Sequence, residues 1–113
     1  MNKDVLEKRK LMSTIVAKDF ADLNGSVMRT VNTVFKSRWF KLSDLLLAFP
    51  ERQDETIETL NYLEKAGYLE ARDIESKVKM EIQYSEFNET EVILTAKGIR
   101  LVKYIETDDA VDV

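Results

Sequence analysis

Histidine and cysteine are both absent, so the side chains that could do chemistry are carboxylates, amines and hydroxyls. This composition excludes a cysteine nucleophile, a histidine-based triad, thiolate metal sites and disulfide bonds. A carboxylate pair such as Asp54 and Glu58 could serve acid–base catalysis, but as neighbours on an exposed helix the two are better explained as solvated charges. Neither a glycine-rich phosphate loop nor a metal-ligand spacing is present. We therefore expect no enzyme activity, cofactor or metal.

The stretch from Leu42 to Leu69 has the pattern of a helix, a tight turn and a second helix. Ser43 is expected to cap the first helix, with Leu42 and Leu47 forming a hydrophobic staple. Pro50 ends this helix, because its ring excludes Phe49 from the helical region and cannot continue the hydrogen-bond ladder. The order of these signals predicts a helix-turn-helix.

The second helix is expected to begin near Asp54. Its apolar side chains recur at helical spacing and form one stripe, which should face the core. Gly67 supplies the left-handed residue that ends the helix and releases Tyr68 and Leu69 as the start of a strand. The residues of the stripe are Ile57, Leu60 and Leu63.

Two motifs in this order carry a resemblance to a known family. The apolar stripe followed by Gly67-Tyr68-Leu69, and later the segment Leu94-Thr95-Ala96-Lys97-Gly98, resemble the winged helix-turn-helix domain of small bacterial transcription regulators. In that family the second helix leads into a β-hairpin wing, and the wing returns into a last helix. The resemblance covers the chain from Ser26 to Ile105. It implies an α+β, mostly helical fold, with a three-helix core, a wing of two or three strands, and additional helices at both ends.

The expected wing begins with the strand 68–74 and ends with the short strand 92–94. Between them, apolar and polar residues alternate strictly over 77–84, which is typical of a strand with one buried face. The exposed tip could lie at 73–76 or at 86–89. The short segment 38–41 is expected to be the small strand that pairs with the wing. The apolar residues of the alternating segment are Val78, Met80, Ile82 and Tyr84.

Helices are also expected at both ends of the domain. Apolar residues at spacings of three and four predict an amphipathic helix over about 4–24. Asn24-Gly25 should then break the chain, and Ser26 should cap the first helix of the three-helix core. The N-terminal helix could pack on its own domain or pair with the same helix in a homodimer. A last helix is expected from Lys97 to Ile105.

The acidic residues are concentrated at the C-terminal end. Residues 106–113 include Glu106, Asp108, Asp109 and Asp112 but no basic or aromatic residue, which predicts a disordered tail after a single domain over 1–105. The net charge of −4 therefore lies in this tail, and the rest of the chain can still carry a local basic face.

The sequence contains no apolar run of the ~20 residues that a membrane span needs. The first ten residues are highly charged and lack the apolar middle region of a signal peptide. We therefore expect a cytoplasmic protein without membrane contact.

The family resemblance implies a transcription regulator that binds double-stranded DNA through the helix-turn-helix and the wing. Groups able to contact bases or phosphates lie before and within the two helices and on the wing. For each of them the alternative is an ordinary solvated side chain, and only convergence on one face without intervening carboxylates favours DNA binding. The DNA-binding candidates are Arg38, Lys41, Ser43, Arg52, Gln53, Thr56, Arg72, Lys77 and Lys79.

The outward face of the second helix departs from the pattern of a DNA reader. A rotation of about 100° per residue places Thr59 and Lys65 outside together with several acidic residues. Carboxylates close to phosphates weaken binding. The alternative hypothesis is therefore a winged-helix protein–protein interaction module that binds a basic protein partner. The candidate residues of this module are Asp54, Glu55, Glu58 and Tyr62.

Overall fold

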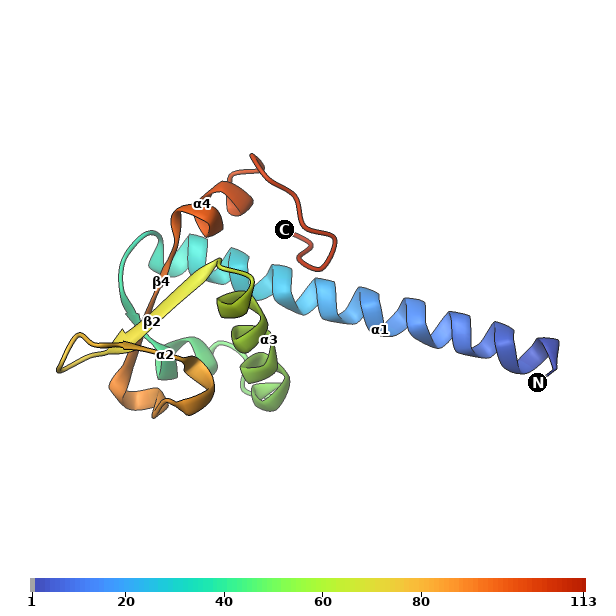
Figure 1. Cartoon of the computed structure of the whole chain (residues 1–113), viewed down its shortest axis with the longest axis horizontal. Helices are drawn as coiled ribbons and strands as arrows, with labels where there is room; N and C mark the ends of the chain where they lie inside the picture. Colours follow the sequence, from blue (N-terminus) through green and yellow to red (C-terminus); the bar gives the residue numbers. More distant parts are fainter. Residues whose placement is uncertain (1) are drawn as a thin grey trace.

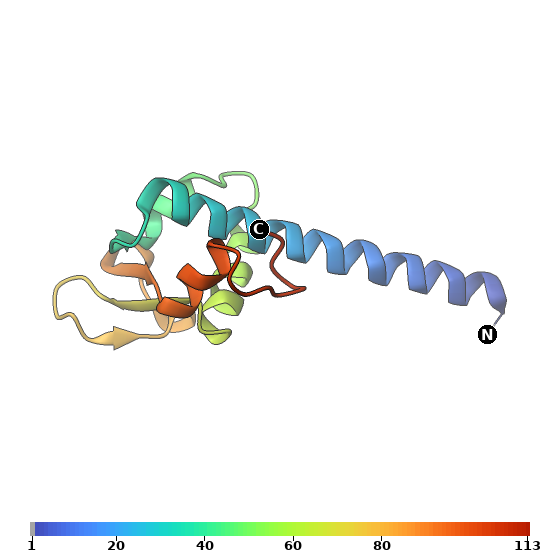
Figure 2. The same cartoon turned by 90° about the horizontal axis from the view of Figure 1, so that it is seen from above.

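The fold of the computed structural model, which describes residues 2–113, is α+β. A long N-terminal helix and several shorter helices accompany a four-stranded antiparallel sheet. The first half of the long helix projects from the body formed by the rest of the chain (Figure 1), and it remains clear of the body in the view from above (Figure 2). The molecule is therefore elongated, with extents of 57 × 30 × 22 Å.

The long helix, α1, runs without interruption from Lys3 to Thr30 and continues into a π-helical turn at Val31–Phe35. The predicted chain break at Asn24-Gly25 is therefore wrong, and Ser26 lies inside α1 instead of capping a new helix. Both residues of the expected break are buried.

Contacts with the C-terminal segment 106–113 explain why Asn24 and Gly25 stay within helix α1. The Asn24 side-chain amide donates to the Ala110 carbonyl at 2.8 Å, and the Asp112 amide donates to the Ala21 carbonyl at 3.0 Å. A Cβ on Gly25 would lie 1.8 Å from the Asp112 carbonyl oxygen, so only glycine leaves room for this contact. The predicted disordered tail is therefore corrected: in the structure it packs against α1.

Two short helices follow α1, as the helix-turn-helix pattern predicted. Helix α2 (Leu42–Leu47) and helix α3 (Gln53–Lys65) flank the turn that contains Pro50. Helix α2 begins two residues earlier than expected, so Lys41 occupies the N-cap position and Ser43 does not cap the helix. The expected staple is also wrong, because the Leu47 side chain is 71 % exposed.

Helix α3 turns its apolar stripe inward, as expected. Leu60 and Leu63 are fully buried, and Ile57 packs against the edge of the core. Gly67 has a φ of +89°, the left-handed conformation predicted for the end of this helix. Thr59, which was expected on the outward face, is buried instead.

The sheet has the strand order β1-β4-β2-β3, and all its pairings are antiparallel. A tight turn closes the β2–β3 hairpin at 73–76, one of the two predicted tips: the Asp73 carboxylate accepts from the Ser76 amide at 2.7 Å. The strands are β1 (Phe40–Lys41), β2 (Leu69–Asp73), β3 (Lys79–Met80) and β4 (Thr90–Leu94).

The long strand predicted over 77–84 is reduced to β3. After it the chain forms two short 3-10 helices, η2 (Ile82–Tyr84) and η3 (Phe87–Glu89), with Ile82 buried and Tyr84 78 % exposed. The reason is that the Ile82 amide donates to the Glu64 carboxylate of α3 at 3.1 Å instead of to a neighbouring strand. This segment therefore folds back on α3.

The last helix, α4, spans Ala96–Val102, with Thr95 capping it by accepting from the Gly98 amide at 3.0 Å. It ends before Ile105, which is 65 % exposed, so the predicted helix is too long. The core lies between the second half of α1, the pair α2 and α3, α4 and the inner face of the sheet. In the part of the chain that the structure describes, no helix is long and apolar enough to cross a membrane.

Candidate nucleic-acid interface

Four charged side chains form one row across all four strands. Lys41 of β1 lies opposite Glu91 of β4, Glu91 lies opposite Arg72 of β2, and Arg72 lies opposite Lys79 of β3. Cross-strand partners point to the same face of a sheet. We call this surface the outer sheet face. The adjacent row points into the core and consists of Phe40, Val92, Ala71 and Met80.

Glu91 lies at the centre of this row and neutralises part of its charge. It accepts from Arg72 Nε at 2.6 Å and from Lys77 Nζ at 3.1 Å, and its side chain is only 13 % exposed. Burial alone would raise the pKa of Glu91, but the hydrogen bonds from the two cations hold it below its usual value. One positive charge remains, because two cations share one carboxylate. The predicted cations therefore converge on one face, but a carboxylate does intervene among them.

Arg72 is held in place by an aromatic ring as well as by Glu91. Its guanidinium carbon lies 3.7 Å from the ring centroid of Trp39, the only tryptophan in the chain. Such a cation–π contact adds to the ion pair and fixes the plane of the guanidinium. The outer sheet face is therefore preorganised at its centre.

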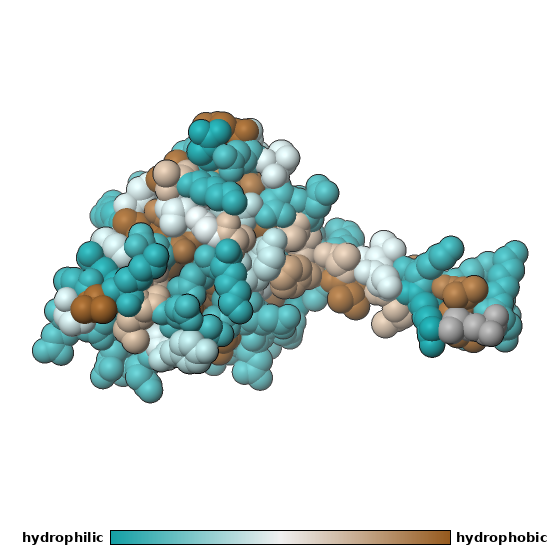
Figure 3. Space-filling model, in the orientation of Figure 1, coloured by the Kyte–Doolittle hydropathy of each residue, from teal (hydrophilic) through white to brown (hydrophobic). Residues whose placement is uncertain are grey.

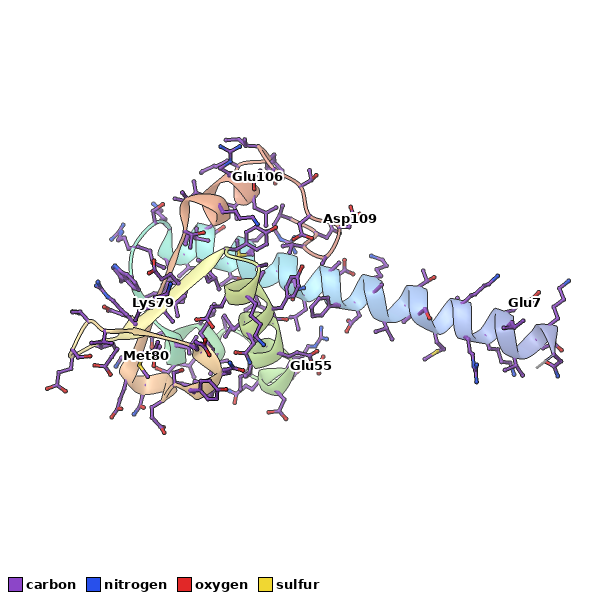
Figure 4. All side chains as sticks on the ribbon, viewed as in Figure 1. Glu7, Glu55, Lys79, Met80, Glu106 and Asp109 are labelled. Atoms are coloured by element: carbon purple, nitrogen blue, oxygen red, sulfur yellow. The ribbon has the colours of Figure 1, made fainter. Side chains whose placement is uncertain are left out.

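Lys41 and Lys79 of this face, and Arg38 shortly before β1, have no carboxylate partner in the described part of the chain. Within residues 2–113, Arg38, Lys41 and Lys79 are exposed and take part in none of the ion pairs. Lys79 lies on the sheet, whereas Glu55 lies near the start of α3, on the side toward α1 (Figure 4). Lys41 and Lys79 therefore add positive charge to the outer sheet face that no ion pair among the described residues neutralises.

The predicted residues at the start of α3 do not join this surface. Arg52 bridges two elements, with Nη2 3.0 Å from the Asp19 carboxylate of α1 and a second ion pair to Glu55. Its hydrogen bond to Glu55 raises the pKa of Arg52 further. Thr56 is fully buried, and its hydroxyl donates to the Arg52 carbonyl at 2.8 Å. Arg52 and Thr56 are thus structural residues, whereas Gln53 is exposed.

The outward face of α3 keeps three exposed carboxylates, Asp54, Glu55 and Glu58. Tyr62 is only partly exposed, because its ring packs edge-to-face on Phe20 of α1 with 5.1 Å between centroids. Burial, together with the nearby Asp108 carboxylate, raises the pKa of the Tyr62 phenol. Helix α1 on one side and the returning segment around Ile82 on the other flank α3.

The sequence did not predict that Glu91 and Trp39 are the partners of Arg72 on this surface. In β4, inward Val92 and Leu94 alternate with outward Glu91 and Ile93. This alternation places Glu91 on the polar face, but its partner depends on the strand register. Ser43, also predicted as a phosphate contact, lies half-buried in the first turn of α2.

Neither a metal site nor a similar protein helps to assign the function of this surface. Among residues 2–113, no group of three or more acidic side chains is placed to hold a metal ion. A scan against protein-family models, a search of curated proteins and a search of solved structures each found no match. The function is therefore argued from the site itself.

Proposed function

We propose that the protein binds double-stranded DNA through the outer sheet face and acts in transcription regulation as a winged helix-turn-helix protein. The observation that carries the proposal is the row that Lys41, Arg72 and Lys79 form on three strands, with Glu91 on the fourth. The order of elements, with β1 before α2 and α3 and with β2 and β4 before α4, supports the winged-helix interpretation.

The charge balance of this face favours a polyanion. Lys41, Arg72, Lys77 and Lys79 lie on it against the two carboxylates Glu70 and Glu91, while Glu64 and Glu81 line a pocket with Lys79 at its edge. With strands about 4.8 Å apart, the row from β1 to β3 spans about 14 Å. Duplex DNA carries one charge per about 1.7 Å of axis, so a surface of this width reaches several phosphates.

The residues divide into two roles under this proposal. Arg38, Lys41 and Lys79 are free to neutralise phosphates, which positions a duplex without reading its sequence. Arg72, fixed on Trp39, presents an immobilised guanidinium to the same strand. Helix α3 stays outside the major groove, because its outward carboxylates would repel phosphates.

Charge reversal on the sheet tests this proposal. Lys41→Glu/Lys79→Glu should weaken binding to a random duplex by about tenfold or more and reduce the salt slope by about 2, because two phosphate contacts are lost. The measurement is a fluorescence-anisotropy titration at low and at physiological salt.

The matched control is Lys10→Glu/Lys103→Glu, which changes the net charge equally on α1 and at the end of α4. It should retain most of the affinity, since neither residue lies on the outer sheet face. Equal losses in the two double variants, or no binding by the unmodified protein at low salt, would contradict the proposal.

A second candidate function is a protein–protein interaction module, and the exposed carboxylates of α3 favour it. Arg52 neutralises Glu55, but Asp54 and Glu58 take part in no ion pair within residues 2–113. A basic peptide would then bind this face. A lysine-rich peptide that binds the protein but not Asp54→Asn/Glu58→Gln, while DNA fails to bind, would establish this alternative.

A further inference from the structure

The projecting half of α1 carries large apolar side chains that no other part of the structure covers. Each of them is between 38 % and 62 % exposed, and Figure 3 shows several apolar patches along the projecting helix. Scattered apolar residues are normal on a surface, but a contiguous series marks an interaction site. These residues are Val5, Leu6, Leu11, Met12, Ile15 and Val16.

Three of these side chains continue the core of the protein along the helix. At about 100° per residue, Val5, Met12 and Val16 lie within about 40° of one another around α1. Leu23 lies at the same angle and is buried in the core. Spacings of seven, four and seven residues are typical of a helix that packs along another helix. We call the three exposed residues Val5, Met12 and Val16 the α1 stripe.

The α1 stripe meets the body at a small hollow of 140 Å³ between α1 and α3. Its floor is apolar, and its rim holds three carboxylates together with Arg52, which pairs with Asp19 and Glu55. The rim therefore keeps a net negative charge, which suits a helix that carries apolar and basic side chains together. The floor includes Val16, Phe20 and Leu23, and the rim includes Asp19, Glu55 and Glu58.

The free end of α1 carries basic residues that complement the acidic rim of this hollow. Lys8 and Arg9 lie on either side of the stripe at about 100° per residue, and both are exposed. If two copies of α1 pair in opposite directions about a two-fold axis level with Thr14, Met12 of one copy faces the partner's Val16. Lys8 and Arg9 then lie level with the partner's Asp19 and with the acidic rim. A parallel pair would instead bring the basic residues of both copies together.

We propose that the α1 stripe binds a second copy of this chain, as an antiparallel helix pair with Lys8 and Arg9 against the partner's acidic rim. The pairing is isologous and closes as a two-fold dimer. With the axis level with Thr14, the exposed segments Arg9–Asp19 of the two copies face each other over about 16 Å of helix, at 1.5 Å per residue. This dimer does not depend on DNA binding.

Acidic substitutions in the stripe test the dimer. In sedimentation equilibrium the unmodified protein should be a dimer, whereas Met12→Glu/Val16→Glu should be a monomer at the same concentration. The control Lys10→Glu/Thr14→Glu changes the opposite side of α1 and should remain dimeric. Circular dichroism should show all three proteins folded, because every changed side chain is exposed.

Cysteine cross-linking tests the direction of the pair, since the chain has no cysteine of its own. A mixture of Met12→Cys and Val16→Cys proteins should form a disulfide-linked heterodimer on oxidation, while each protein alone should cross-link poorly. Efficient cross-linking of each variant with itself would indicate a parallel pair and overturn the proposed arrangement. An unmodified protein that is monomeric at all concentrations would overturn the dimer itself.

Discussion

Two half-buried glutamates, Glu91 in the sheet and Glu64 on α3, differ in what stabilises their charge. Glu91 accepts hydrogen bonds from Arg72 and Lys77, and its pKa is lowered although burial acts in the opposite direction. Glu64 accepts from the Ile82 backbone amide, and burial raises its pKa. Glu91 is therefore held by direct ion pairs, whereas Glu64 makes no ion pair within residues 2–113, and the nearby Lys79 and Lys65 offset the effect of its burial only in part.

This difference indicates which face of the molecule suits DNA. On the outer sheet face, Glu91 is fully compensated and positive charge is left over. On α3 the exposed charges are mainly carboxylates, and Arg52, the cation at its start, is engaged with Asp19 and Glu55. Under the proposal, the sheet therefore supplies the contact surface in place of α3.

The largest effect in this comparison is expected from Glu91→Gln. It removes a negative charge and frees two cations, so affinity for a random duplex should rise several-fold at low salt. Loss of the partly buried ion pairs should also lower the free energy of unfolding by about 1 kcal/mol. Anisotropy titration and urea unfolding measure the two effects.

Glu64→Gln is the control for that variant, because it removes the same charge from α3. It should raise DNA affinity less than Glu91→Gln does, because Glu64 makes no ion pair with a cation of the outer sheet face within residues 2–113, although Lys79 lies near enough to lower its pKa. If Glu91→Gln failed to strengthen binding, or if Glu64→Gln strengthened it equally, the outer sheet face would not be the contact surface.

The second-largest effect is expected in the pH dependence of folding stability, to which Glu91 and Glu64 should contribute with opposite signs. The pKa of Glu91 is lowered on folding, so its stabilisation is complete above the unfolded value of about 4.3 and is lost as pH falls through the folded pKa. The pKa of Glu64 is raised, so its contribution is most favourable below about 4.3 and is lost as pH rises through the folded value.

Thermal unfolding between pH 3 and 7 should therefore separate the two variants. Relative to the unmodified protein, Glu91→Gln should become less stable as pH rises, and Glu64→Gln should become more stable. Parallel profiles would mean that the two carboxylates have similar surroundings after all.

The smallest effect is expected from Asp54→Asn/Glu58→Gln on the outward face of α3. DNA affinity should change by less than about twofold, since exposed charges beyond a Debye length of about 8–10 Å are largely screened. The same titration measures it. A much larger gain in affinity would place α3 next to the phosphates and restore it as the DNA-reading helix.

The sequence was most informative where its signals are local. Pro50 ended one helix, Gly67 ended the next, and the spacing of Leu60 and Leu63 identified the buried side of α3. Each of these signals acts within a few residues, so no knowledge of the tertiary structure was needed.

Predictions failed where distant segments decide the structure. Asn24 and Gly25 resemble a break, but they remain helical while the chain near Ala110 and Asp112 packs against them. Alternation alone could not show that the segment after β3 turns toward Glu64.

In the candidate site, too, the sequence predicted what local signals determine and missed what distant contacts determine. Sequence named Lys41, Arg72, Lys77 and Lys79 as charges on or beside the wing, and the register places them on one face. It could not show that a salt bridge to α1 withdraws Arg52 from that set.

The most direct measurement uses the fluorescence of Trp39, which lies under Arg72 and is the only tryptophan. Tryptophan emission and anisotropy of a labelled duplex should be followed in the same low-salt titration. DNA on the outer sheet face should change Trp39 emission in proportion to the bound fraction. Binding detected by anisotropy with unchanged Trp39 emission would contradict the proposed contact surface.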